Sequence, residues 1–327
     1  MSRRGALLFA AMSVIWGVPY LLIKVAVVDL GPVVLVAGRL VLAVAVLLPF
    51  ALRRGALRAA WRHRGTVAAY AAVEMAAPWW LLSHAELRVS SSFAGLVIAT
   101  VPLVGAGIAW ALHRERLDGG RAVGLLVGLV GVVLLLGVDL AGGADALAVV
   151  ELLVVAVCYA VGPIIVARRL GEVPALGVNT LALALAALVY VPWALTDLPA
   201  TPPGPAVLGA VVVLGLVCTA LAFLLFFALI AEVGAARATV ITYVNPAVAL
   251  VLGVALLGER VTLGMLVGFP LVLVGSVLAT RRSRPPVPEP VALPDAAGDE
   301  PPTAPDSRDT AGQPARRAAK VASRRPW

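Results

Sequence analysis

The sequence has few charged residues, and this scarcity limits the solvent in which the chain can fold. Asp, Glu, Lys and Arg make up 13% of the 327 residues, whereas 61% are hydrophobic and the mean hydropathy is +0.99. A water-soluble globule needs more polar surface than this composition supplies. The composition excludes an ordinary soluble domain and predicts a polytopic membrane protein.

Cysteine, histidine and nucleotide-binding motifs are also scarce or missing. Cys158 and Cys218 lie inside apolar runs, and the three histidines have no ligand spacing, so we expect neither a metal nor a cofactor. The sequence has no phosphate-binding loop of the Walker type, which argues against ATP hydrolysis as an energy source. Nucleic acid is not expected as a partner, because no soluble domain could read a groove and the net charge of +8 follows from topology.

Long apolar runs without strand alternation are abundant. Crossing about 30 Å of hydrocarbon takes about 20 helical residues, and several charge-free runs reach that length. The sequence predicts ten transmembrane helices, near residues 5–28, 33–52, 66–83, 91–112, 121–138, 146–167, 174–196, 205–231, 237–257 and 262–280. The third and sixth of these carry a carboxylate, Glu74 and Glu151.

Arginines gather on one side of the predicted spans. They occupy positions 3, 4, 53, 54, 58, 62, 64, 114, 116, 121, 168, 169, 281, 282 and 284, whereas the other side carries Asp29, Asp139, Asp145 and Asp197. The exceptions are Arg88 and Arg260. By the positive-inside rule, the arginine-rich side faces the cytoplasm. We therefore expect a multi-pass protein of the cytoplasmic membrane with both termini in the cytoplasm.

The chain also repeats itself. With an offset of 144 residues and no gap, 89–134 and 233–278 match at sixteen of 46 positions. The matches include Pro102/Pro246, Glu115/Glu259, Arg116/Arg260 and three pairs of glycines. Five spans per copy is an odd number, so the second copy would enter the membrane from the opposite side. The sequence thus predicts an all-α fold of two inverted five-helix repeats, 1–140 and 141–280, an architecture suited to alternating access and solute translocation.

Several motifs resemble the EamA-like proteins of the drug/metabolite transporter superfamily. They are Trp16-Gly17 with Lys24, Gly31-Pro32 with Arg39, Pro102 to Glu115-Arg116, Asn245-Pro246 and Gly258-Glu259-Arg260. The resemblance covers about residues 5–280. It implies a ten-helix permease that exports small metabolites, such as amino-acid-like solutes or drugs, and it does not single out a substrate.

Ionisable groups at membrane depth are the first candidates for a site, because each costs about 2.5 to 3.5 kcal/mol to insert. Glu74 lies near the middle of its span, one turn before Pro78 and beside Trp79. It is a candidate for proton coupling or for binding a cationic substrate, with a structural salt bridge to Arg39 or Lys24 as the alternative. Arg39 is deep enough to need a partner or an anionic substrate group, whereas Lys24 can reach the interface.

Prolines, aromatic residues and an amide complete the predicted pathway. Pro102 and Pro246 are expected in mid-helix, where each would free a backbone carbonyl for binding or bending. Cavity-lining side chains are expected at Trp16, Tyr20, Tyr159, Tyr243 and Asn245, which suit amphipathic solutes. Packing against lipid or protein is the alternative for each.

The repeated residues Glu115, Arg116, Glu259 and Arg260 are expected to be framework at helix ends, with a gating salt bridge as the alternative. Glycines at 124, 128, 131, 264, 268 and 275 should let the fifth and tenth helices pack closely, either to brace the repeat or to pair two protomers. Residues 281–327 hold ten prolines, six acids and nine basic residues, which predicts a disordered cytoplasmic tail.

Three functions remain open at this level. The first is a secondary transporter, not an enzyme, whose partners are a small-molecule substrate and the bilayer, with the proton as candidate coupling ion and a second copy as candidate partner. The second is a lipid-linked sugar translocase or a non-transporting scaffold. The third is a membrane-embedded enzyme, which would need a cluster of catalytic groups at one depth.

Overall fold

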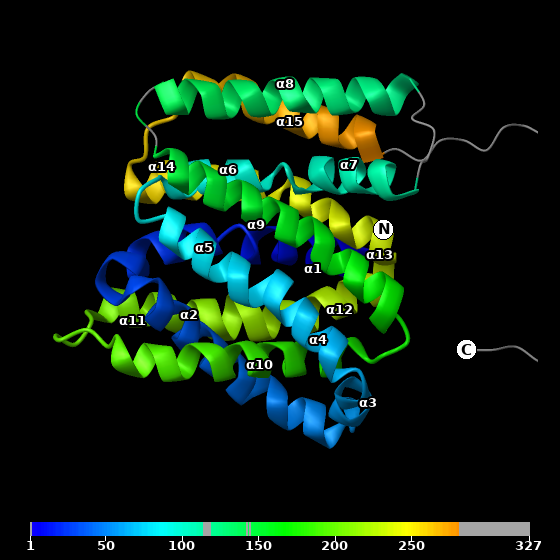
Figure 1. Ribbon diagram of the computed structural model, residues 1–327, viewed down its shortest axis with the longest axis vertical. Helices are drawn as coiled ribbons and strands as arrows, with labels where there is room; N and C mark the ends of the chain where they lie inside the picture. The colour runs from blue at the N-terminus through cyan, green and yellow to red at the C-terminus, as the bar shows by residue number, and fades with distance from the viewer. Residues whose placement is uncertain (1, 114–118, 142, 144, 281–327) are drawn as a thin grey trace, which may run out of the picture. The chain divides into compact units, whose positions relative to one another are not determined.

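The fold of the described residues is built from helices, as the composition predicts. The structure, a computed structural model, describes residues 2–113, 119–141, 143 and 145–280 (Figure 1). The tail predicted to be disordered, 281–327, and the framework residues Glu115 and Arg116 lie outside these residues. Eight stretches are long and apolar enough to cross a membrane: Arg3–Arg53, Ser91–Ala111, Gly119–Gly137, Ala146–Leu170, Ala175–Thr196, Pro205–Val233, Thr239–Leu257 and Leu263–Thr280.

The helices follow one another with few irregular residues between them. The first half contains α1 Arg3–Ile15, α2 Pro19–Arg53, α3 Ala56–Arg62, α4 Arg64–Ala71, the π-helix η1 Ala72–Ala76, α5 Ala77–Ala85, α6 Ser91–Ile98, α7 Val101–His113 and α8 Gly119–Ala141. The second contains α9 Ala146–Ile165, the π-helix η2 Val166–Leu170, α10 Ala175–Thr196, α11 Pro205–Val212, the π-helix η3 Val213–Leu221, α12 Ala222–Val233, α13 Ala235–Ala238, the 3₁₀-helix η4 Thr239–Tyr243, α14 Asn245–Leu257 and α15 Leu263–Thr280.

The eight stretches differ from the ten predicted spans in two parts of the chain. The first two predicted spans form one stretch of 51 residues, which is interrupted inside α2 at Gly31 with φ 68° and ψ 162°. Only glycine adopts that conformation without strain, and Pro32 follows it. The third predicted span, 66–83, is divided among α4, η1 and α5 and is not among the eight.

Pro102 and Pro246 do not lie in the middle of continuous helices, contrary to the prediction. Each is the second residue of its helix, α7 or α14, although each lies within a longer apolar stretch. Proline suits the first turn of a helix because its missing N–H would have no partner there. The two prolines therefore start new helical segments within their stretches instead of kinking them.

Helix boundaries recur at the spacing of the sequence repeat. The two ends of α7, Val101 and His113, lie 144 residues before the two ends of α14. The first residues of α6 and α13, and those of α8 and α15, are separated by the same 144 residues. The residues 144 positions after η1 are 216–220, and they lie inside η3. The two parts of the chain thus share an order of elements that includes a π-helical turn.

Helices α8 and α15 pack against each other at very close range (Figure 1). A Cβ atom at Gly131 would lie 2.6 Å from the backbone nitrogen of Val272, and one at Gly268 would lie 2.7 Å from the carbonyl oxygen of Gly131. Such distances leave no room for a side chain, so glycine lets the two backbones meet. These faces brace two helices of the same chain, which is one of the two roles predicted for them.

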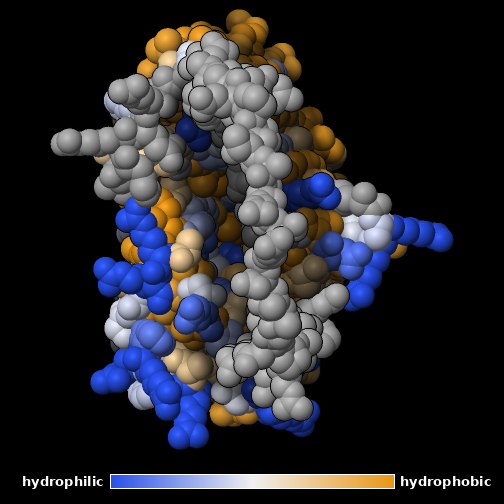
Figure 2. Space-filling view, turned by 90° about the vertical axis from the view of Figure 1, so that its right-hand side faces the viewer, coloured by the Kyte–Doolittle hydropathy of each residue, from blue (hydrophilic) through white to orange (hydrophobic). Residues whose placement is uncertain are grey.

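Hydrophobic side chains cover much of the helical surface. On α8, Leu126 and Val133 are 64% and 61% exposed. Figure 2 looks at the end where the N-terminus lies in Figure 1 and shows hydrophilic side chains gathered there, beside hydrophobic ones. Exposed arginines occupy positions 53, 54, 58, 62, 64, 168 and 169. An apolar surface with basic groups gathered at helix ends is what a bilayer requires.

Candidate functional site

A buried arginine lies between helices of both halves of the chain. Arg39 of α2 is 8% exposed, and its Nε donates a hydrogen bond of 2.8 Å to Oγ1 of Thr219 in η3. Its guanidinium carbon lies 3.6 Å from the ring centroid of Trp79 in α5. Among the described residues no carboxylate is within ion-pairing distance of Arg39. The site therefore holds a fixed cation that stacks on an aromatic ring and has no anionic partner in the part of the chain seen here.

Glu74 of η1 contributes a carboxyl group to the same region. Its Oε2 is buried and has no hydrogen-bond partner within the described residues. It faces Gly162 of α9, where a Cβ atom would overlap this oxygen. Glu74 forms no salt bridge with Arg39 or Lys24, the predicted alternative, within the described part of the chain. A carboxyl group in this position can bind a proton or a cationic group of a ligand.

Two tyrosines connect these charged groups. Tyr159 of α9 interacts electrostatically with both Arg39 and Glu74, and it packs against two separate clusters of buried hydrophobic side chains. Tyr20 of α2 is 8% exposed and interacts with Tyr159 and Arg39. The structure thus brings together five of the predicted residues, Glu74, Arg39, Trp79, Tyr159 and Tyr20, which we call the central site.

Two charged or polar members of this region lie in π-helical turns. Glu74 is the middle residue of η1, and the N–H of Ala77 bonds back to the carbonyl of Ala72. Thr219 lies in η3 and donates to the carbonyl of Leu214, five residues earlier. A π turn widens the helix by one residue and often occurs where side chains must be presented to a ligand. Tyr190 of α10 donates to the carbonyl of Ala76 at 2.9 Å and secures the end of η1.

Trp16 and Asn245 form a different group, next to the buried Pro246. Trp16 follows α1 and packs on Phe223 and Phe226 of α12, with ring centroids 6.3 and 4.7 Å away. The Asn245 amide, oriented to satisfy its neighbours, donates to the carbonyls of Ile241 and Ser13 at 2.9 and 3.0 Å. These contacts join α1 to α14 and α12, so these residues serve packing in this conformation.

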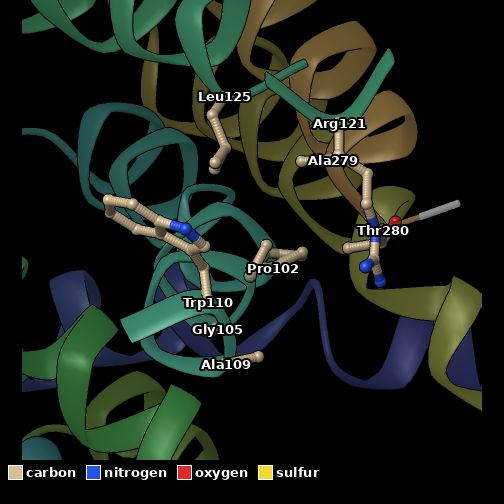
Figure 3. Close-up of a pocket in the computed structure, with 9 residues that line it drawn as sticks. Pro102, Gly105, Ala109, Trp110, Arg121, Leu125, Ala279 and Thr280 are labelled. Atoms are coloured by element: carbon tan, nitrogen blue, oxygen red, sulfur yellow. The ribbon is translucent and has the colours of Figure 1, made fainter. Parts of the chain in front are cut away.

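Pro102 lines a pocket of 340 Å³ between α7, α8 and α15. Figure 3 shows Trp110 on one side of this pocket and Arg121, Ala279 and Thr280 on the other. Tyr243 lies beside it, with its hydroxyl 3.1 Å from Oγ1 of Thr280. Pro102 and Tyr243 are therefore placed at this pocket and not in the central site.

Lys24 and Glu151 lie near the turn that joins α5 to α6. The Lys24 ammonium donates to the carbonyls of Glu86 and Val89 at 2.5 and 2.8 Å. Glu151 is 6% exposed and pairs with Arg88 at 2.5 Å, while His84 Nδ1 lies 2.7 Å from its other oxygen. Both side chains therefore tie helices together at this end of the molecule.

Glu259 binds the first turn of α6. Its oxygens accept hydrogen bonds from the N–H groups of Ser91 and Ser92 at 2.8 Å and from the Ser91 hydroxyl at 2.9 Å. Burial acts to raise the pKa of Glu259, but the hydrogen bonds from the two serines outweigh it and hold the pKa below the usual range. Arg260 next to it is exposed. The carboxylate therefore caps a helix, which agrees with a framework role.

Several residues of the site carry no signal in the sequence. Thr219, Gly162 and Tyr190 are ordinary members of apolar runs, and only contacts between distant helices bring them to the central site. Among the described residues, no three His, Cys, Asp or Glu side chains lie close enough together to hold a metal ion.

A helical fold with eight stretches long and apolar enough to cross a membrane among the described residues is that of a multi-pass membrane protein. The chain belongs to the EamA-like transporter family, whose family model matches twice, at residues 3–137 and 146–281.

Individual relatives agree with this membership. The chain is 30% identical over 261 residues to the uncharacterized inner membrane transporter YedA of Escherichia coli strain K12, covering 77% of this chain and 82% of the relative. It is 23% identical over 267 residues to an uncharacterized transporter of Archaeoglobus fulgidus, covering 82% and 95%. A solved crystal structure with 22% identity has a similar fold, with a TM-score of 0.60 over 84% of this chain and 96% of that one.

Proposed function

We propose that the protein is a secondary transporter that exports small amphipathic metabolites across the cytoplasmic membrane by alternating access. The substrate class favoured by the central site is a zwitterionic, amino-acid-like solute. Its carboxylate would bind Arg39, its ammonium would bind Glu74, and its apolar part would lie against Trp79 and Tyr159.

One observation carries the proposal: a buried cation and a half-buried carboxyl group with one buried oxygen share Tyr159 as a neighbour, yet form no ion pair among the described residues. Arg39 is held by Thr219 and Trp79, while Oε2 of Glu74 has no partner among the described residues. Charges at this depth are costly unless they are compensated. A ligand with both charges would compensate both groups at once, and a proton on Glu74 would do so in its absence.

The proposed mechanism requires that the protein has ten membrane spans, arranged as two inverted repeats of five. The double match to the family model and the recurring helix boundaries support two equivalent halves. Gly31 supplies the break that would divide α2 into two spans. With an odd number of spans per half, the halves would be inverted and could exchange conformations around the central site. The exposed arginines support a cytoplasmic location for both termini.

Flux into proteoliposomes tests the proposal. Purified protein would be reconstituted and offered radiolabelled neutral amino acids, cationic amines and sugars, with and without a proton gradient. We expect saturable uptake of zwitterionic solutes that Glu74→Gln and Arg39→Gln abolish, with both variants still folded. Absence of flux over the whole panel would overturn the proposal, and flux of lipid-linked sugar alone would favour a lipid-linked sugar translocase.

A further inference from the structure

A second carboxyl group, outside the central site, is buried more completely than Glu74. Glu86 follows the last residue of α5, in the turn formed by residues 86–90, and its exposed fraction is 0%. Neither of its carboxyl oxygens has a hydrogen-bond partner in the described part of the chain. A bare carboxylate without donors is among the most costly groups to bury, so this arrangement suits the neutral acid.

A cation lies close by but does not pair with this group. The Lys24 ammonium interacts electrostatically with Glu86, yet its hydrogen bonds go to the main-chain carbonyls of Glu86 and Val89. No ion pair between the two side chains forms within the described residues. By holding two carbonyls of one turn, the ammonium fastens the 86–90 turn to α2. An ionised Glu86 would compete with these carbonyls for the same ammonium, because a charged acceptor binds it more strongly.

We propose that the Glu86 carboxyl is a proton-binding site of its own, and that its proton controls whether Lys24 fastens the 86–90 turn to α2. With the proton bound, the ammonium stays on the carbonyls of Glu86 and Val89. When the proton leaves to solvent, the ammonium moves to the carboxylate, the two carbonyls lose their donor and the turn opens.

Burial favours the protonated form of Glu86, against the effect of the nearby Lys24. Burial raises the pKa of Glu86 well above its usual range; Lys24 opposes this shift, and Glu259 beyond the end of α14 adds to it. His84 and Arg88 flank Glu86 on the same segment, but both are engaged by Glu151 of α9. Because the pKa is raised, the closed turn is stable at low pH and is lost as the pH rises through the pKa of the folded protein.

The turn is also connected to the central site. Tyr20 lies four residues before Lys24, on the same side of α2, and interacts electrostatically with both Glu86 and Arg39. Release of Lys24 would therefore be felt at Arg39 through Tyr20. The inference goes beyond the proposed transport function, because it concerns the state of the turn and does not depend on which solute is carried.

Thiol labelling of the turn tests the proposal. In a background with Cys158 and Cys218 replaced by serine, Val89→Cys places a thiol at a position that is 7% exposed, and Leu87→Cys places one at a position in the same turn that is 41% exposed. The ratio of the two labelling rates with an impermeant maleimide cancels the pH dependence of the thiol itself. We expect the ratio of the Val89→Cys rate to the Leu87→Cys rate to rise about tenfold per pH unit below the midpoint of a single-proton transition and to level off above it. A ratio that does not change with pH would overturn the proposal.

Variants assign the transition to Glu86. Glu86→Gln should keep the ratio low at every pH, whereas Lys24→Met should keep it high at every pH, because the ammonium that fastens the two carbonyls is gone. The second variant still tests the proposal if the first does not fold. Loss of the transition in His84→Gln with retention in Glu86→Gln would overturn it. Glu74→Gln should leave the transition intact, so failure of the transport proposal and failure of this one are separable.

Discussion

Gly162 of α9 lies directly against the carboxylate of Glu74, so closely that a Cβ atom at position 162 would overlap Oε2. The contact joins the two halves of the chain at the central site. It also leaves Glu74 one oxygen that is buried without a partner among the described residues. Position 162 therefore controls where the carboxyl group can point.

Replacing this glycine with alanine should impair transport and leave the fold intact. The added methyl group must displace the end of the Glu74 side chain, which can rotate away without moving the backbone. We expect flux of zwitterionic solutes into proteoliposomes to fall about tenfold, equivalent to about 1.4 kcal/mol of lost binding. Gly209→Ala is the matched control, because nothing lies within 4 Å of a Cβ atom there. Equal flux in the two variants would contradict the assignment of Glu74.

Replacing Arg39 with lysine should weaken substrate binding although the charge is kept. Lysine lacks the planar group that stacks on Trp79 and the Nε–H that binds Thr219. The stacking contributes about 0.5 to 2 kcal/mol, and a hydrogen bond to a charged group about 1.5 to 3 kcal/mol. Ligand-induced thermal shifts measure the loss of affinity. An unchanged shift in Arg39→Lys would show that charge alone suffices.

Removing the charge of Glu259 should lower thermal stability in a pH-dependent manner. The pKa of Glu259 is lower in the folded protein, so its stabilisation is present above the pKa of the unfolded chain and is lost as the pH falls through the folded one. Glu259→Gln should lower stability at neutral pH by about 1 kcal/mol, the usual value of a helix cap. At acidic pH it should differ less from the parent.

Thermal unfolding in detergent across the pH range measures this difference. The exposed Glu172 offers a control, since Glu172→Gln should match the parent protein at every pH. A constant difference between Glu259→Gln and the parent at all pH values would contradict the capping role.

Alanine at Gly275 should separate α8 from α15. A Cβ atom at this position would overlap backbone atoms of Gly128, and backbone cannot rotate away as a side chain can. We expect a loss of stability of about 1 to 3 kcal/mol, typical of overpacking. Gly137→Ala on α8 is the control, because its Cβ would meet nothing within 4 Å. Similar unfolding temperatures for the two variants would argue against tight pairing of these helices.

Hydrophobic runs and charge spacing were sufficient to predict the helical membrane fold, because the bilayer limits the structures that can cross it. Glycine and proline also marked an irregularity at Gly31-Pro32, although the predicted helix end there is an interruption inside α2. The position of Pro102 within its span was predicted, but its place at the start of a helix was not. A proline has the same local signature in a kink and in a first turn, and only the backbone around Ala99 and Thr100 distinguishes the two.

The central site was predictable in its charged and aromatic members but not in its small ones. Glu74 and Arg39 stand out because charge at membrane depth is rare and costly. Thr219 and Gly162 cannot be found this way, since hydroxyl and glycine are common in membrane helices and their roles depend on contacts with distant residues. Trp16 and Asn245 show that residue types suited to a cavity also serve packing, which was the alternative predicted for both.

The π-helical turn at Ala72–Ala76 sets the angular phase of everything that follows it in α5. One extra residue in a helical turn rotates the remainder of the helix by about 100° relative to an uninterrupted α-helix. In the preceding π turn, a backbone hydrogen bond spans five residues instead of four. The indole of Trp79 lies over the guanidinium of Arg39 after the resulting rotation. A helix that relaxed to regular α-geometry would carry the indole around the axis and take it off the cation. The geometry of the site thus depends on the winding of this helix as well as on the identity of its side chains.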